Sequence, residues 1–168
     1  LNGMGITVGQ KLVSHPSVKG VGFTGSLKAG RALFDLAAKR KEPIPVFAEM
    51  GSINPVVITE NALNANGTKW AESYAGSITL GCGQFCTNPG LIIAPEGEAL
   101  DNFVSVLSKS LEEQQTSNML HPNITSSYEK NRNDLLIKDE VELIASVNAS
   151  EVNHASQTLA LTKAQDFI

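Results

Sequence analysis

The chain has 168 residues, 42% of them hydrophobic and 18% charged, which is enough apolar material for a globular protein with a buried core. Its apolar runs are all shorter than the roughly 20 residues of a membrane-spanning helix, so we expect no membrane partner. A formal net charge of −4 argues against a nucleic-acid partner bound through a broad basic surface.

The first third of the chain alternates between helix-like and strand-like segments. His15-Pro16 ends the first helix, because the residue before a proline avoids the helical region. Ser26 is a good N-cap, and apolar residues recur after it at helical spacing. The expected elements are a helix over 5–13, a strand over 19–24, a helix over 27–41, and strands over 45–49 and 54–59.

The rest of the chain contains longer helices and a glycine-rich loop. One helix carries Trp70, Tyr74 and Ile78 on a single face, which we expect to lie in the core. The expected elements are a helix over 62–79, the loop over 81–90, a strand over 91–94, helices over 100–113 and 122–137, and strands over 141–147 and 158–162. This alternation predicts an α/β fold with a largely parallel sheet and flanking helices.

A Gly25-Ser26 pair joins a predicted strand to a predicted helix. The N–H groups at a helix start attract phosphate, although such turns are also common where no ligand binds. The charge distribution leaves the same two interpretations open. Residues 1–48 carry a net +5 and residues 49–168 a net −9, so the basic part either serves an anionic ligand or is ordinary solvated charge.

Two cysteines are too few for a disulfide framework, which favours a reducing, cytoplasmic compartment. Cys86 lies in the loop GCGQFCTNPG, where backbone donors would favour a nucleophilic thiolate, whereas an inert cysteine is the ordinary alternative. Cys82 competes for that role, and a Cys82–Cys86 redox pair is a further alternative.

Glu49 ends an apolar strand, either as a solvated acid or as a general base at the ligand-binding edge of the sheet. The three histidines are far apart in sequence, so we expect no metal site.

Three short motifs follow one another in a specific order: FTGS at 23–26, EMGS at 49–52 and GQFC at 83–86. In order and approximate spacing they resemble the signature blocks of the aldehyde dehydrogenase superfamily. The variants NPVV at 54–57 and TNPG at 87–90 look like the branch that holds the 2-oxoglutarate semialdehyde (2,5-dioxovalerate) dehydrogenases and the NADP-linked fatty aldehyde dehydrogenases.

The resemblance implies a chemistry for each block. It assigns Cys86 as the nucleophile that forms a thiohemiacetal and then a thioester, and Glu49 as the base that activates water. It also implies NAD or NADP as cofactor and a small-molecule aldehyde as substrate, with 2-oxoglutarate semialdehyde or a related aldehyde favoured. The residues it assigns to cofactor binding are Gly5, Gly25, Ser26, Gly30 and Met50.

The resemblance further implies the three-layer α/β fold of the family. Residues 1–52 would be the C-terminal end of the NAD(P)-binding domain and residues 53–168 the N-terminal part of the catalytic domain. The family's oxyanion asparagine and nicotinamide-ribose glutamate have no counterpart here, so we expect a fragment that is inactive alone. The resemblance also implies that the full-length protein is a homo-oligomer, a dimer or tetramer. The alternative is an inactive nucleotide-binding or structural module.

Overall fold

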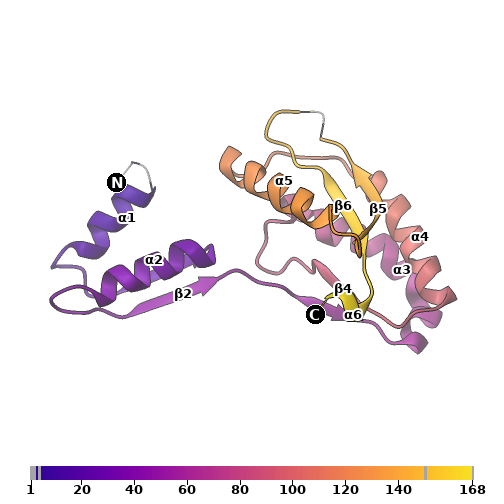
Figure 1. Ribbon diagram of the computed structural model, residues 1–168, viewed down its shortest axis with the longest axis horizontal. Helices are drawn as coiled ribbons and strands as arrows, with labels where there is room; N and C mark the ends of the chain where they lie inside the picture. Colours follow the sequence, from indigo (N-terminus) through magenta and orange to yellow (C-terminus); the bar gives the residue numbers. More distant parts are fainter. Residues whose placement is uncertain (1–2, 4, 150, 168) are drawn as a thin grey trace. The chain divides into compact units, whose positions relative to one another are not determined.

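The computed structural model describes residue 3, residues 5–149 and residues 151–167. The chain divides into two compact units, Leu1–Ser52 and Ile53–Ile168. Each unit has its own helices and strands, and the ribbon in Figure 1 follows them in chain order.

The first unit is a strand–helix–strand arrangement preceded by a helix. Its elements are α1 (Gly5–Ser14), β1 (Val21–Gly25), α2 (Leu27–Ala38) and β2 (Val46–Met50). The two strands pair in parallel, with Thr24 opposite Glu49 and Gly25 opposite Met50. Their carboxyl ends therefore meet at one edge of the pair, where β1 leads into α2.

The second unit contains two strand pairs and the longest helices. Its elements are β3 (Pro55–Val57), α3 (Glu60–Thr79), the short 3₁₀ segment η1 (Leu80–Gly83), β4 (Leu91–Ile93), α4 (Glu98–Glu112), α5 (Pro122–Leu136), β5 (Glu142–Val147), β6 (Gln157–Leu161) and α6 (Ala164–Phe167). Strands β3 and β4 are parallel, whereas β5 and β6 are antiparallel. In Figure 1, α3 and α4 lie side by side.

The core of the second unit lies between α3 and α4. Helix α3 presents small buried residues four positions apart, Gly67, Ala71 and Ala75, and α4 packs against α3 with Phe103 and Leu107 buried. Small side chains on one helix let the bulky side chains of the other approach closely, which gives dense packing.

The predicted alternation of helices and strands is confirmed. The described strands pair two by two, and the elements agree with their expected ranges to within three residues at each end. The prediction that Trp70 lies in the core is wrong, because its side chain is 39% exposed and the small residues of α3 form the buried face instead. Helix α6 was not predicted.

We predict that Leu107→Ala lowers the free energy of unfolding by about 2–5 kcal/mol, because it leaves a cavity in the core. Leu107 is fully buried, whereas the matched control Leu120 is 84% exposed. Leu120→Ala should change the same free energy by less than about 0.5 kcal/mol in urea denaturation followed by circular dichroism. Equal losses in the two variants would contradict this assignment of the core.

Candidate functional site

The turn between β1 and α2 has the features of a phosphate-binding helix start. Ser26 is the N-cap of α2, with its Oγ accepting a hydrogen bond from the backbone N–H of Ala29 at 3.2 Å. The hydroxyl proton of Ser26 can still donate, because this contact uses only a lone pair. Gly25 immediately precedes it, so the turn has no Cβ at that position.

Gly30 allows α2 to lie against β2. A Cβ added at Gly30 would come within 2.2 Å of Sδ of Met50, so even an alanine would force Met50 to move. The side chain of Met50 therefore fills the space above Gly30, one position after Glu49. The structure thus gives these two residues a role in packing α2 onto the strand end.

Glu49 lies at the carboxyl end of β2, opposite Thr24. Its side chain is exposed in the first unit, and the backbone N–H of Gly51 donates to the carbonyl of Gly25 at 3.2 Å just beyond it. The structure therefore brings Glu49, Gly25 and Met50 to the same sheet edge as the N-terminus of α2. The residues of this unit leave the carboxylate solvated.

Gly5 is the first residue of α1, and α1 packs against α2. A Cβ added at Gly5 would meet no atom within 4 Å, so the surface around it is open. The structure thus offers space at the helix backbone there.

The cysteine loop begins with an unusual backbone conformation. Gly81, Cys82 and Gly83 all have positive φ values, of 58°, 57° and 68°. Gly83 cannot be replaced without strain, because a Cβ there would also lie 3.1 Å from the carbonyl oxygen of Ile78. These three residues turn the chain sharply out of α3 and into the segment that carries Cys86.

The two cysteines have different surroundings. Sγ of Cys82 lies 3.0 Å from the carbonyl oxygen and 2.8 Å from Oγ of Ser117, so this half-buried thiol attaches the loop to the segment after α4. Cys86 is exposed, at the second position of a turn closed by the N–H of Asn88 and the carbonyl of Phe85 at 3.0 Å. Accessibility therefore favours Cys86 as the reactive thiol.

Side-chain hydrogen bonds fix the backbone of the loop and attach it to neighbouring elements. The side-chain amide of Asn54 donates to the carbonyls of Cys86 and Asn88, at 2.9 Å each. Nδ2 of Asn88 donates to the carbonyl of Ile78 at 2.7 Å, and the hydroxyl of Tyr74 donates to the carbonyl of Pro89. The sequence did not predict these contacts of Asn54 and Tyr74 with the loop, and only the Asn-Pro pairing at 54–55 offered a signal.

Burial raises the pKa of Tyr74 to about 12. Its hydroxyl therefore stays protonated and remains a hydrogen-bond donor throughout the physiological range. The ring is fixed by an edge-to-face contact with Phe103, with the centroids 6.4 Å apart, so the core helices position the donor that holds the end of the loop.

The predicted site residues fall into two groups. Glu49 belongs to the first unit, together with Gly5, Gly25, Ser26, Gly30 and Met50, and Cys86 belongs to the second. Each group is built by contacts within its own unit.

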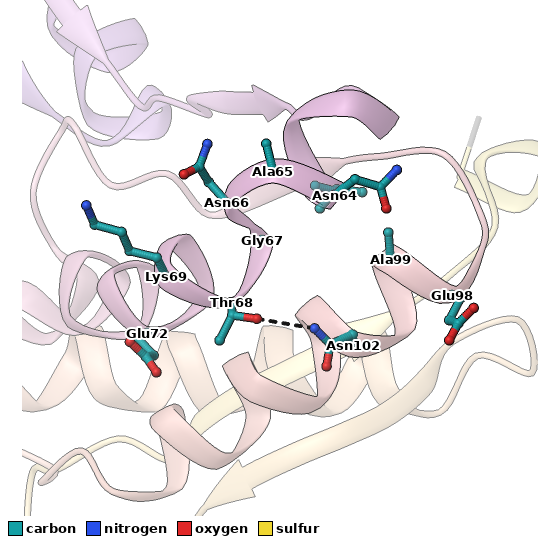
Figure 2. A pocket seen from close by; sticks show the side chains of 11 residues that line it. Asn64, Ala65, Asn66, Gly67, Thr68, Lys69, Glu72, Glu98, Ala99 and Asn102 are labelled. Atoms are coloured by element: carbon teal, nitrogen blue, oxygen red, sulfur yellow. Dashed lines mark hydrogen bonds between the residues drawn. The ribbon is translucent and has the colours of Figure 1, made fainter.

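A surface hollow of about 640 Å³ lies between the starts of α3 and α4 (Figure 2). Its lining is largely polar, and a hydrogen bond from Asn102 to Thr68 crosses it at 3.3 Å. None of the predicted site residues lines it, so the hollow does not mark the candidate site.

The described part of the chain contains neither a membrane-spanning helix nor a cluster of metal-binding side chains. Its helices include none that is long and apolar enough to cross a bilayer. Its His, Cys, Asp and Glu side chains form no group of three or more that could hold a metal ion.

Two solved structures share the fold of this chain. A proline utilization A variant from Bradyrhizobium japonicum aligns with a TM-score of 0.83 and 22% identity, over 98% of this chain and 17% of its own. An NAD-dependent benzaldehyde dehydrogenase from Corynebacterium glutamicum aligns with a TM-score of 0.77 and 21% identity, over 94% and 35% of the two chains. At these identities the likeness concerns the fold alone, and it confirms the predicted α/β class.

Curated relatives are closer in sequence. The alpha-ketoglutaric semialdehyde dehydrogenase of Acinetobacter baylyi is 44% identical over 153 residues, which are 91% of this chain and 29% of that protein. Alpha-ketoglutaric semialdehyde dehydrogenase 2 of Azospirillum brasilense is 43% identical over 169 residues, 100% of this chain and 32% of its own length. The chain thus spans about a third of the length of these relatives.

The family model for the aldehyde dehydrogenase family matches residues 1–134. That span includes both groups of candidate site residues, from Gly5 to Cys86. The chain belongs to the aldehyde dehydrogenase family.

Proposed function

We propose that this chain is a segment of an enzyme that oxidises an aldehyde to a carboxylic acid, with Cys86 as nucleophile. The observation that carries the proposal is the exposed Cys86, presented on a loop whose backbone carbonyls accept hydrogen bonds from Asn54 and Tyr74, in a chain of this family. Residues 1–52 would be the end of the cofactor-binding domain, and residues 53–168 the beginning of the catalytic domain.

In the proposed reaction the Cys86 thiolate attacks the carbonyl carbon. A C–S bond forms, and the carbonyl electrons move to the oxygen, which gives a thiohemiacetal anion. Loss of hydride from the same carbon leaves a thioester on Cys86. The enzyme then requires water to attack that thioester.

Glu49 is proposed as the base for the second half of the reaction. Its carboxylate takes a proton from water, the resulting hydroxide attacks the thioester carbon, and the C–S bond breaks. The acid leaves, and the Cys86 thiolate is restored. The exposure of Glu49 in its unit is compatible with access of water to the carboxylate.

The residues at the β1–α2 turn fit a dinucleotide. The start of α2 and the Ser26 hydroxyl would bind the pyrophosphate, Gly25 would let it approach the backbone, and Gly5 leaves open space at α1 for the adenine. Gly30 and Met50 would act by fixing α2 against β2. When bound, NAD or NADP supplies the nicotinamide that accepts the hydride.

The substrate is proposed to be alpha-ketoglutaric semialdehyde (2-oxoglutarate semialdehyde) or a related aldehyde, since two relatives above 40% identity carry that name. Two cysteines in the thiol form suit a reducing, cytoplasmic location. The full-length enzyme is proposed to be a dimer or tetramer.

The chain itself permits a first test of the nucleophile. We predict that iodoacetamide labels Cys86 at least about tenfold faster than Cys82 in the folded chain, because Cys86 is exposed and Cys82 is bonded to Ser117. Peptide mass spectrometry measures both rates, and labelling of the urea-unfolded chain is the control in which the two rates should converge. Equal rates in the folded chain would favour an inert, structural role for both thiols.

In the full-length enzyme, Cys86→Ser should abolish turnover, because a serine hydroxyl is far less ionised than a thiol. Cys82→Ser is the matched control, and it should retain turnover within about threefold, since a serine hydroxyl can replace the thiol as donor to Ser117. Steady-state production of reduced cofactor measures both. If Cys82→Ser lost activity and Cys86→Ser retained it, Cys82 would be the nucleophile and Cys86 the structural thiol.

Glu49→Gln keeps the shape of the side chain and removes the base. Steady-state turnover of the full-length enzyme should fall by about 10²–10⁴-fold, while the first turnover survives as a stoichiometric burst of reduced cofactor. Stopped-flow absorbance shows the burst, and mass spectrometry of the quenched protein shows the acyl adduct on Cys86. Loss of the burst together with turnover would mean that Glu49 activates the thiol instead.

A further inference from the structure

We propose that Asn54 is a positioning residue for the Cys86 nucleophile, which it holds in place through the carbonyl of Cys86 itself. This inference rests on the proposed role of Cys86. It adds a residue whose side chain contacts the backbone of the nucleophile and lies 32 positions before it in the sequence.

The contact uses the full donor capacity of the side chain. Nδ2 of Asn54 lies 2.9 Å from the carbonyl oxygen of Cys86 and 2.9 Å from that of Asn88. A primary amide has two N–H groups, so one is available for each carbonyl. The two carbonyls on either side of Thr87 are thereby directed at a single nitrogen.

This arrangement fixes the peptide planes next to the thiol. Each peptide is planar and trans, so a carbonyl held in one direction also fixes the N–H on the other side of the bond. The turn is closed independently by the N–H of Asn88 and the carbonyl of Phe85 at 3.0 Å. With both contacts made, the Cα of Cys86 has a defined orientation, from which the thiol extends.

Asn54 is itself held by the sheet. It precedes Pro55, which restricts its backbone to extended conformations, and Pro55 pairs with Leu91 in the parallel β3–β4 pair. The cysteine loop leads directly into β4, and Asn54 immediately precedes β3. The parallel register therefore places the amide beside the loop at the amino end of the two strands.

The other contacts of the loop act at a different point. Asn88 reaches the end of α3 through the carbonyl of Ile78, and Tyr74 reaches Pro89, so both hold the end of the loop that follows the turn. The two hydrogen bonds of Asn54 act on the carbonyls of Cys86 and Asn88 from outside the loop. Their loss should free the thiol's orientation without unfolding the loop.

The test compares Asn54→Ala and Asn54→Asp in the full-length enzyme. Losing two hydrogen bonds that each contribute modestly should reduce the burst rate constant and kcat by about 10–100-fold, with KM for both substrates within about twofold. Asn54→Asp keeps the shape but replaces the donors with a carboxylate facing two carbonyl oxygens, so its kcat should be at least as low. Asn102→Ala is the matched control, since that amide donates to Thr68 between α3 and α4.

All rates are expressed per Cys86 thiol titrated with iodoacetamide, and the melting temperature of each variant is measured. A kcat per titrated thiol equal to that of the wild type, whatever the melting temperature, overturns the positioning role. Near wild-type activity in Asn54→Asp also overturns it, because packing alone would then suffice. Activity that persists in Cys86→Ser overturns the proposed function instead, so the two failures are distinguishable.

Discussion

The backbone of the cysteine loop is held by side chains that donate to its carbonyl groups. A loop has no ladder of its own to satisfy its polar groups, so its conformation depends on the partners that surrounding elements supply. Asn54 supplies them at Cys86 and Asn88, and Tyr74 supplies one at Pro89. The conformation of the candidate nucleophile therefore depends on Asn54, which immediately precedes β3, and on Tyr74 of α3.

The core between α3 and α4 positions one of these donors. Tyr74 is on α3, whose small buried residues let α4 approach, and its ring rests against Phe103 of α4. Because the ring that packs against Phe103 also carries the hydroxyl that donates to the carbonyl of Pro89, core packing and loop geometry are linked through one side chain. A cavity in the α3–α4 core would thus affect both stability and the loop.

The first unit builds its site differently. Parallel pairing brings the ends of β1 and β2 to one edge, and the N-cap Ser26 directs α2 away from that edge. Backbone groups, the Ser26 hydroxyl and the exposed Glu49 side chain lie at this edge. The N-terminus of a helix at the carboxyl ends of parallel strands is suited to an anionic ligand such as a phosphate.

The sequence alone determined where the helices, strands and turns lie along the chain, and in which order the three motifs follow one another. Helical spacing, the Ser26 cap and the prolines depend on neighbours within a few residues, so they can be identified without a fold. The sequence also indicated Cys86, Glu49 and the β1–α2 turn as candidate parts of the functional site. The assignment of Trp70 to the core failed, because which face of a long helix is buried depends on the partner it meets.

Only the tertiary structure decided which side chains hold the loop of the proposed nucleophile. Asn54 and Cys86 are 32 residues apart, and they meet because β3 and β4 pair in parallel and in a definite register. The separate role of Cys82, as a bond to Ser117 35 residues away, has the same origin. Neither contact leaves a periodic pattern in the sequence, since each depends on chain segments that become neighbours only when the sheet and helices pack.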